Sequence, residues 1–254
     1  MFGGTSVGGN LLVCRGAGNV TFTAGQAFNA ADIYYIQTWN AGELSISFND
    51  GSERTQIRQH GPQCIKKITI ISDSPQQAVV VEGCSEPAYI LGIDCYDLRR
   101  PHLKVWNMGW AGSTTETWTR TDTPWSSLNA LRYFAPDFAI LDLGINDWCK
   151  DVNPEAYKQN LVKISEVLLE KGDVILKSPL PTKADFVSLS TQEKFVRKMR
   201  EVADELKLPL VDIWSNWENY ERMVDLGFYR DPKHATALGY SDVAEIVATA
   251  FRTF

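Results

Sequence analysis

Histidine is scarce in this sequence, and the cysteine pattern typical of metal centres is missing. There are three histidines, and the five cysteines, Cys14, Cys64, Cys84, Cys95 and Cys149, include no Cys-x-x-Cys pair. Because metal sites are mostly built from these two residue types at short spacings, we expect no metal site. The odd number of cysteines leaves at least one thiol unpaired, and we interpret them as reduced and mostly buried.

Long apolar runs and an excess of basic residues are also missing. No stretch approaches the roughly 20 apolar residues of a membrane-spanning helix, so we expect no membrane partner. The chain has 25 Lys and Arg against 31 Asp and Glu, with a net charge of −6. Nucleic-acid binding depends on clustered basic residues, so a nucleic-acid partner is not expected. The first residues lack a basic region followed by an apolar stretch, which predicts no secretory signal.

The sequence changes style near residue 104. From about Val20 to Asp97, short β-rich runs alternate with turns, which predicts an antiparallel β-sandwich. From about Lys104, apolar runs alternate with helical patterns, which predicts parallel β-α units. In this second part the expected strands are 103–107, 138–144, 174–180 and 209–214, and the expected helices are 154–172, 191–206 and 240–251.

An acid precedes a histidine by three residues near the end of the chain, in Asp231-Pro-Lys-His234. On a turn, this spacing allows the carboxylate to accept a hydrogen bond from the imidazole Nδ1–H and leaves Nε2 free to take a proton. The pair therefore indicates a general base, and hence a hydrolase, although a surface turn would show the same pattern. His60 and His102 lack such a partner and are interpreted as surface or turn residues.

Two further segments place donors of hydrogen bonds at the ends of expected strands. In 141–148, Asn146 follows an apolar strand, where its side-chain amide could stabilise an oxyanion. In 105–118, a strand-like run leads into small residues around Gly112, whose backbone N–H could approach a ligand closely. Taken singly, the first segment is more typical of a turn with a helix cap, and the second of a tight strand-to-helix turn.

Together, in chain order, these segments resemble the conserved blocks of the SGNH (GDSL-like) hydrolase family. The matching patterns are N-x-G-x-x-G-x-T-T from Asn107, G-x-N-D from Gly144, and D-x-x-H-x-T-x-x-G-Y from Asp231. The resemblance covers about Lys104 to the C-terminus. It implies a flavodoxin-like three-layer α/β/α domain with a parallel sheet.

The resemblance also implies the roles of individual residues. It makes His234 the catalytic base, oriented by Asp231, and it gives the oxyanion hole to the N–H of Gly112 and the side chain of Asn146. It implies no metal or organic cofactor. Trp110 and Trp148 follow strand ends beside these motifs, and we interpret them as walls of the cleft that stack on sugar faces.

The family's Gly-Asp-Ser nucleophile motif is absent from this chain. The nearest variant, Gly4-Thr5-Ser6, makes Ser6 the predicted nucleophile. Ser74 is one alternative, because it lies 38 residues before Gly112, and a residue upstream of this sequence is the other. With Ser6, residues 1–14 form the start of the hydrolase domain, 15–103 a β-sandwich resembling a carbohydrate-binding module, and 104–254 the main part of the hydrolase.

This layout resembles SGNH carbohydrate esterases with an inserted β-sandwich, including phage tail-spike deacetylases and peptidoglycan O-acetylesterases. It implies a serine esterase that removes O-acetyl groups from an acylated glycan substrate. The alternatives are a lipid esterase or thioesterase of the same fold, and a glycan-binding module without activity. The resemblance further suggests a homo-oligomer, a trimer for a phage tail component, and leaves the location open between a virion and the cytoplasm.

Overall fold

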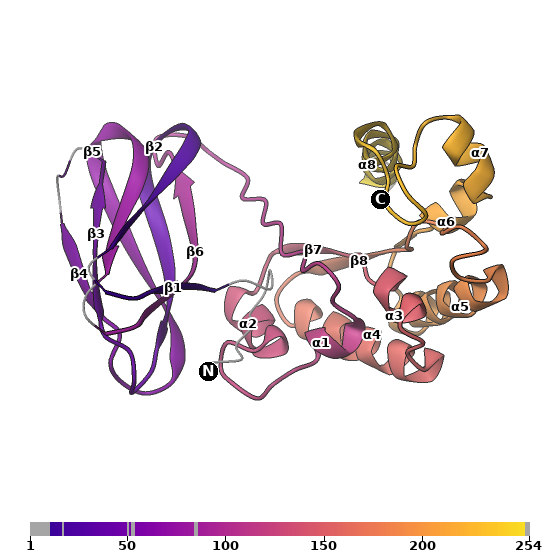
Figure 1. The fold of residues 1–254 in the computed structure, drawn as a ribbon, viewed down its shortest axis with the longest axis horizontal. Coiled ribbons are helices and arrows are strands. Elements are labelled where there is room, and N and C mark those ends of the chain that lie inside the picture. Colours follow the sequence, from indigo (N-terminus) through magenta and orange to yellow (C-terminus); the bar gives the residue numbers. More distant parts are fainter. Residues whose placement is uncertain (1–10, 17, 50, 52–53, 84–85, 252–254) are drawn as a thin grey trace. The chain divides into compact units, whose positions relative to one another are not determined.

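The computed structural model describes residues 11–16, 18–49, 51, 54–83 and 86–251. By their internal contacts these residues form two compact units (Figure 1). The N-terminal unit comprises the chain up to Ala111 together with Thr121–Tyr133, and the C-terminal unit comprises Gly112–Arg120 and the chain from Phe134. The segment 104–111, which the sequence assigns to the hydrolase, thus has its contacts in the N-terminal unit.

The N-terminal unit is built on one antiparallel sheet with strand order β1-β6-β2-β5-β3-β4. The antiparallel arrangement was predicted, but the described strands form one continuous sheet and not the two separate sheets of a sandwich. The strands are β1 Leu12–Cys14, β2 Asn19–Gln37, β3 Glu43–Phe48, β4 Thr55–Arg58, β5 Cys64–Gly83 and β6 Ala88–Tyr96.

Two long strands explain this difference from the prediction. β2 and β5 pair over 14 positions, with register shifts around Phe28. The sequence runs 20–24 and 31–39 read as separate strands, yet 20–24 and 31–37 both belong to β2. A β-bulge bends the strand between them without ending its pairing with β5. Residues of β2, β3, β5 and β6, including Phe28, Leu44, Val81 and Ile90, share one hydrophobic core.

A buried carboxylate fastens the chain that follows β6 to this sheet. Asp32 of β2 is 2% exposed and accepts hydrogen bonds from Thr69 at 2.6 Å and from Tyr96 at 3.1 Å. Lys104 pairs with Asp32 at 3.1 Å and with Asp94 at 2.8 Å. Burial acts to raise the pKa of Asp32, but the bonds from Thr69 and Lys104 outweigh it and lower the pKa. The segment around Lys104 is therefore attached to the sheet by ion pairs and does not form a strand.

The C-terminal unit contains the predicted parallel sheet, in the order β7-β8-β9. Its strands are β7 Phe138–Leu141, β8 Asp173–Lys177 and β9 Leu210–Val211. The expected strand at 103–107 is wrong, since these residues form no strand and Val105 is 83% exposed. The helices are α1 Thr115–Trp118, α2 Ser127–Phe134, α3 Ile145–Cys149, α4 Pro154–Leu169, α5 Leu189–Leu206, α6 Ile213–Asn216, α7 Tyr220–Asp225 and α8 Ala237–Phe251.

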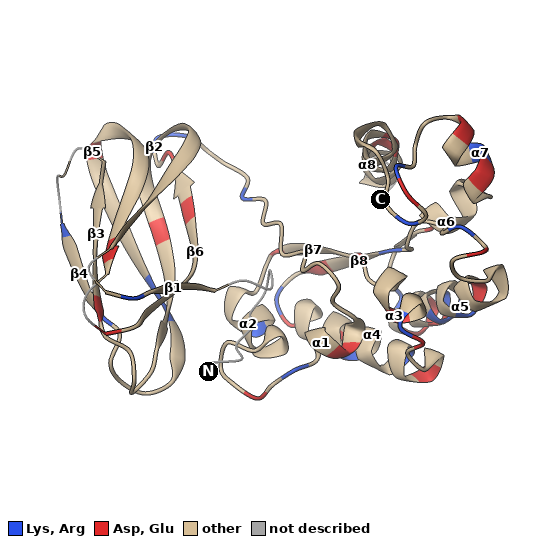
Figure 2. Ribbon diagram, in the orientation of Figure 1, with Lys and Arg blue, Asp and Glu red and all other residues tan. Residues whose placement is uncertain are grey.

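Helices pack on this sheet from two sides. α4 contacts β7 and β8, and α5 packs on α4, while Val243 of α8 shares a core with Ile175 and Val211 (Figure 1). Basic and acidic residues are interspersed along α4 and α5 (Figure 2), and Lys158 of α4 bridges Glu201 and Glu205 of α5. Among the helices of the described residues, none has the length and apolar character needed to cross a bilayer.

The turn between α4 and β8 provides a test of this packing. A Cβ on Gly172 would lie 2.2 Å from the carbonyl oxygen of Pro136, just before β7. Gly172→Ala should therefore push the turn away from β7 and lower the free energy of unfolding by about 1–3 kcal/mol, measured by urea denaturation. Gly92→Ala is the control, because nothing lies within 4 Å of its added Cβ. Equal stability of the two variants would contradict this packing.

Candidate active site

The Asp231–His234 turn has the geometry that the sequence predicted. The His234 Nδ1 lies 2.9 Å from Oδ1 and 2.8 Å from Oδ2 of Asp231. The same carboxylate accepts the backbone N–H of Lys233 at 3.0 Å and that of His234 at 2.9 Å. An N–H of Arg230 donates to the carbonyl of His234 and closes the turn. The imidazole is therefore held by one nitrogen, and its ring is 44% exposed.

These hydrogen bonds decide the charge of Asp231. Partial desolvation acts to raise its pKa, but the backbone N–H of Lys233 and the bonds from His234 lower the pKa to about 2. The carboxylate is thus ionised at any pH near neutrality. An ionised partner on Nδ1 fixes the imidazole tautomer and stabilises the imidazolium that forms when Nε2 takes a proton.

Neighbouring loops anchor this turn. The hydroxyl of Tyr220 donates to the carbonyl of Asp231 at 3.2 Å, and the N–H of Lys183 donates to the carbonyl of Pro232 at 2.9 Å. Tyr229 donates to the carbonyl of Pro181, which follows β8. The loop after β8 and the turn that carries His234 are therefore fixed to one another.

Asn146 lies in the first turn of α3, directly beyond β7. Gly144 precedes this helix with φ of 139°, a conformation that L side chains rarely adopt. The Asn146 Nδ2 donates to the carbonyl of Ser113 at 3.0 Å. That bond uses one of the two N–H donors of the amide, so the second remains for another acceptor. The structure thus brings Asn146 next to the segment that carries Gly112.

A buried carboxylate that the sequence reading missed joins these two segments. Asp147 is fully buried, and it accepts the backbone N–H of Thr115 at 3.0 Å and the Thr115 hydroxyl at 2.6 Å. Asn160 of α4 donates to the same hydroxyl at 3.3 Å. Burial raises the pKa of Asp147, against the opposing effect of the Thr115 bonds. The only sequence signal was the pairing of T-T with G-x-N-D in the motifs.

Gly112 is held from the same helix. It has φ of 75°, and its carbonyl accepts a 2.6 Å hydrogen bond from the Lys150 ammonium. Lys150 follows α3, so α3 and its next residue contact the 112–115 segment through three side chains, those of Asn146, Asp147 and Lys150. A peptide whose carbonyl is fixed has its orientation fixed, which is what an N–H donor to an oxyanion requires.

Lys233, the neighbour of His234 in the chain, acts electrostatically on Cys149, the last residue of α3. Burial raises the pKa of Cys149, and the positive charge of Lys233 acts against this shift.

The predictions for the other site residues are tested by the structure to different extents. Ser6 lies outside the described residues. The alternative Ser74 lies within β5 of the N-terminal unit, where its hydroxyl accepts a bond from Gln76 at 3.0 Å, so it is not on a strand-to-helix turn. Trp110 is half-buried, and its role stays a prediction.

Trp148 is 2% exposed and packs edge-on against Phe195 of α5. The prediction that it forms a cleft wall is therefore wrong, because the helical turn of α3 points it into the core. Within the described part of the chain, no three His, Cys, Asp or Glu side chains are grouped so that they could hold a metal ion.

The low pKa of Asp231 predicts a pH effect on stability. An unfolded Asp titrates near 3.9, so the ionised carboxylate stabilises the fold fully above about pH 4, and this contribution is lost as the pH falls towards 2. Asp231→Asn should lower stability at pH 7, and its difference from the parent should shrink between pH 4 and 2 in denaturant titrations. Asp185→Asn, on a side chain that is 86% exposed, is the control. An Asp231 carboxyl that titrates near 4 by NMR would refute the assignment.

Comparison with known proteins identifies the family of this chain. A model of the GDSL-like lipase/acylhydrolase family matches residues 94–241, more than half of the chain. No curated protein gives a significant match.

Among solved structures, a peptidoglycan O-acetylesterase matches with a TM-score of 0.75 and 16% identity, over 99% of this chain and 72% of its own. A lipase/acylhydrolase from Enterococcus faecalis matches with a TM-score of 0.44 and 21% identity, over 54% and 69%. An acetyl xylan esterase matches with a TM-score of 0.45 and 17% identity, over 56% and 78%. At these identities the likeness bears on the fold alone. By the family match, the chain belongs to the GDSL-like lipase/acylhydrolase family and has the SGNH hydrolase fold.

Proposed function

We propose that this acylhydrolase is a serine esterase that removes O-acetyl groups from a carbohydrate. The observation that carries the proposal is the Asp231–His234 pair, whose hydrogen bond leaves the imidazole Nε2 as the basic atom. The likeness in fold to a peptidoglycan O-acetylesterase over nearly the whole chain supports the choice of an acetylated glycan.

The proposed reaction uses these residues in two steps. The Ser6 hydroxyl attacks the ester carbonyl and gives its proton to Nε2 of His234, and the imidazolium then protonates the departing sugar oxygen. Water, activated by His234, then attacks the acetyl-serine and releases acetate. Asp231 stabilises the imidazolium in both steps.

The backbone N–H of Gly112 and the side-chain amide of Asn146 donate hydrogen bonds to the oxyanion of the tetrahedral intermediates. Oxyanion donors lower the barrier when they are fixed in place before the reaction. The contacts of Lys150 with Gly112 and of Asp147 with Thr115 supply this fixation in the proposed mechanism. Lys150, Asp147 and Thr115 thus act as positioning residues, whereas Gly112 and Asn146 touch the substrate.

Replacement of the base tests the proposed chemistry. His234→Ala should lower the rate of acetate release from O-acetylated peptidoglycan or acetylated xylan by about 10²- to 10⁴-fold, because general acid–base catalysis contributes that much. His60→Ala and His102→Ala are matched controls, since the His60 ring packs edge-on against Trp39 and the His102 ring stacks on Tyr96. Full activity of His234→Ala would exclude the mechanism. Faster hydrolysis of p-nitrophenyl palmitate than of the acetyl ester would favour a lipid esterase, and no hydrolysis would favour a glycan-binding module.

The nucleophile needs a separate experiment. A fluorophosphonate probe should label Ser6 in the folded chain, and the labelling should disappear in His234→Ala, because an unactivated serine reacts poorly with such probes. Peptide mapping by mass spectrometry identifies the labelled residue. Label on Ser74 or on any other residue would refute the assignment of Ser6.

A further inference from the structure

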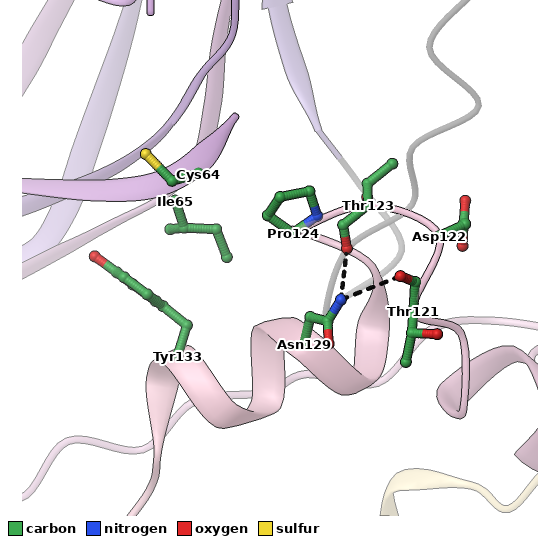
Figure 3. Close-up of a pocket in the computed structure, with 8 residues that line it drawn as sticks. All are labelled: Cys64, Ile65, Thr121, Asp122, Thr123, Pro124, Asn129 and Tyr133. Carbon is green, nitrogen blue, oxygen red and sulfur yellow. Dashed lines mark hydrogen bonds between the residues drawn. The ribbon is translucent and has the colours of Figure 1, made fainter. Parts of the chain in front are cut away.

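The N-terminal unit contains a pocket of about 520 Å³ (Figure 3). It lies between the start of β5 and the segment that leads into α2, and all of its lining residues belong to this unit. Its volume falls within the roughly 300–1,000 Å³ of small-molecule sites. The lining residues are Cys64, Ile65, Thr121, Asp122, Thr123, Pro124, Asn129 and Tyr133.

One wall of the pocket is a turn that its own hydrogen bonds keep in shape. Asn129 donates through Nδ2 to the carbonyls of Thr121 at 3.3 Å and Thr123 at 2.9 Å, as the dashed lines in Figure 3 show. The Ser126 hydroxyl donates to the Asp122 carboxylate at 3.0 Å and accepts the N–H of Thr123 at 2.9 Å. The wall is therefore formed before any ligand arrives, which reduces the entropy cost of binding.

The opposite side of the pocket offers an aromatic surface. Tyr133 is 40% exposed, and it lies one helical turn after Asn129 on the same face of α2. Figure 3 shows its ring extending from α2 beside Ile65 and Cys64 of β5. Burial raises the pKa of Tyr133, so its hydroxyl stays protonated at neutral pH. An exposed ring face with a polar tip suits the C–H face of a sugar.

The polar groups of the lining limit the kind of ligand. Among the described lining residues there is one carboxylate, on Asp122, and no Lys, Arg or His, which disfavours phosphate and other anions. The hydroxyl of Thr121 has no hydrogen-bond partner within the described residues, so a ligand can reach it. A purely apolar acyl chain would cover the Thr121 hydroxyl without offering it a hydrogen bond, which costs binding energy.

We propose that this pocket binds one uncharged sugar unit of the glycan, stacked on Tyr133 and hydrogen-bonded to the 121–123 turn. The class of ligand rests on the proposed function, whereas the pocket is lined by residues other than Asp231 and His234. A glycan chain held here would be retained by the protein independently of the ester that is cleaved.

Binding to the whole chain tests this proposal without any turnover. The His234→Ala protein is titrated by calorimetry with the neutral oligosaccharides chitotetraose and xylotetraose, and with tetragalacturonic acid as an acidic probe. At least one neutral probe should bind, and the acidic probe should bind more weakly because it faces Asp122. Because no hydrolysis is measured, failure of the esterase assay and failure of this site give different results.

Variants locate the binding. Tyr133→Ala should weaken binding about tenfold, the worth of one aromatic contact, and Tyr133→Phe should keep most of it. Thr121→Val removes an exposed hydroxyl without touching the carbonyl that Asn129 binds, and it should also weaken binding. Trp39→Ala, which removes a 58% exposed aromatic ring elsewhere in the unit, is the control and should bind normally. Absence of binding by both neutral probes, tighter binding of the acidic probe, or unchanged affinity in Tyr133→Ala and Thr121→Val would overturn the proposal.

Discussion

The fully buried carboxylate of Asp147 is the contact on which the candidate site depends. It joins α3 to Thr115, a residue 32 positions earlier, through a backbone and a hydroxyl hydrogen bond. Burying a charged group is costly unless hydrogen bonds compensate for the loss of water, so this contact tolerates little displacement. Because Asn146 precedes Asp147 and Gly112 lies three residues before Thr115, both candidate oxyanion donors are positioned by the same link.

The Asp231–His234 pair is organised by a different principle. Its carboxylate is saturated by local N–H donors, so its charge and orientation come from the turn itself. The two halves of the candidate site are thus built in contrasting ways: one by a long-range buried bond and the other by a short loop that carries its own hydrogen bonds. The loop after β8 then holds the turn to the rest of the unit.

The separation in sequence between two bonded residues decides whether the sequence alone could predict their contact. The Asp231–His234 bond spans three residues, so its spacing alone indicated it. The approach of Asn146 to Ser113 spans 33 residues and was expected only through the family resemblance. The role of Asp147 was missed because an acid near the start of a short helix is also typical of a helix cap, and because its partner Thr115 is 32 residues away in the sequence.

The predictions from the sequence were wrong where a local pattern is compatible with more than one structure. Residues 103–107 have the composition of a strand, but Lys104 is engaged by two carboxylates. The tryptophan at 148 follows a strand end in the sequence, but the helix that begins at Ile145 turns it inward.

The path of the backbone between the two units has a consequence for any attempt to separate them. The chain leaves the N-terminal unit after Ala111, returns to it at Thr121 and leaves again after Tyr133. A single cut cannot yield two intact units. A cut after Ala111 leaves Thr121–Tyr133 of the N-terminal unit on the C-terminal fragment, and a cut after Tyr133 leaves Gly112–Arg120 of the C-terminal unit on the N-terminal fragment. The two units are therefore interleaved along the chain, and a clean separation calls for circular permutation or loop replacement and not for a single truncation.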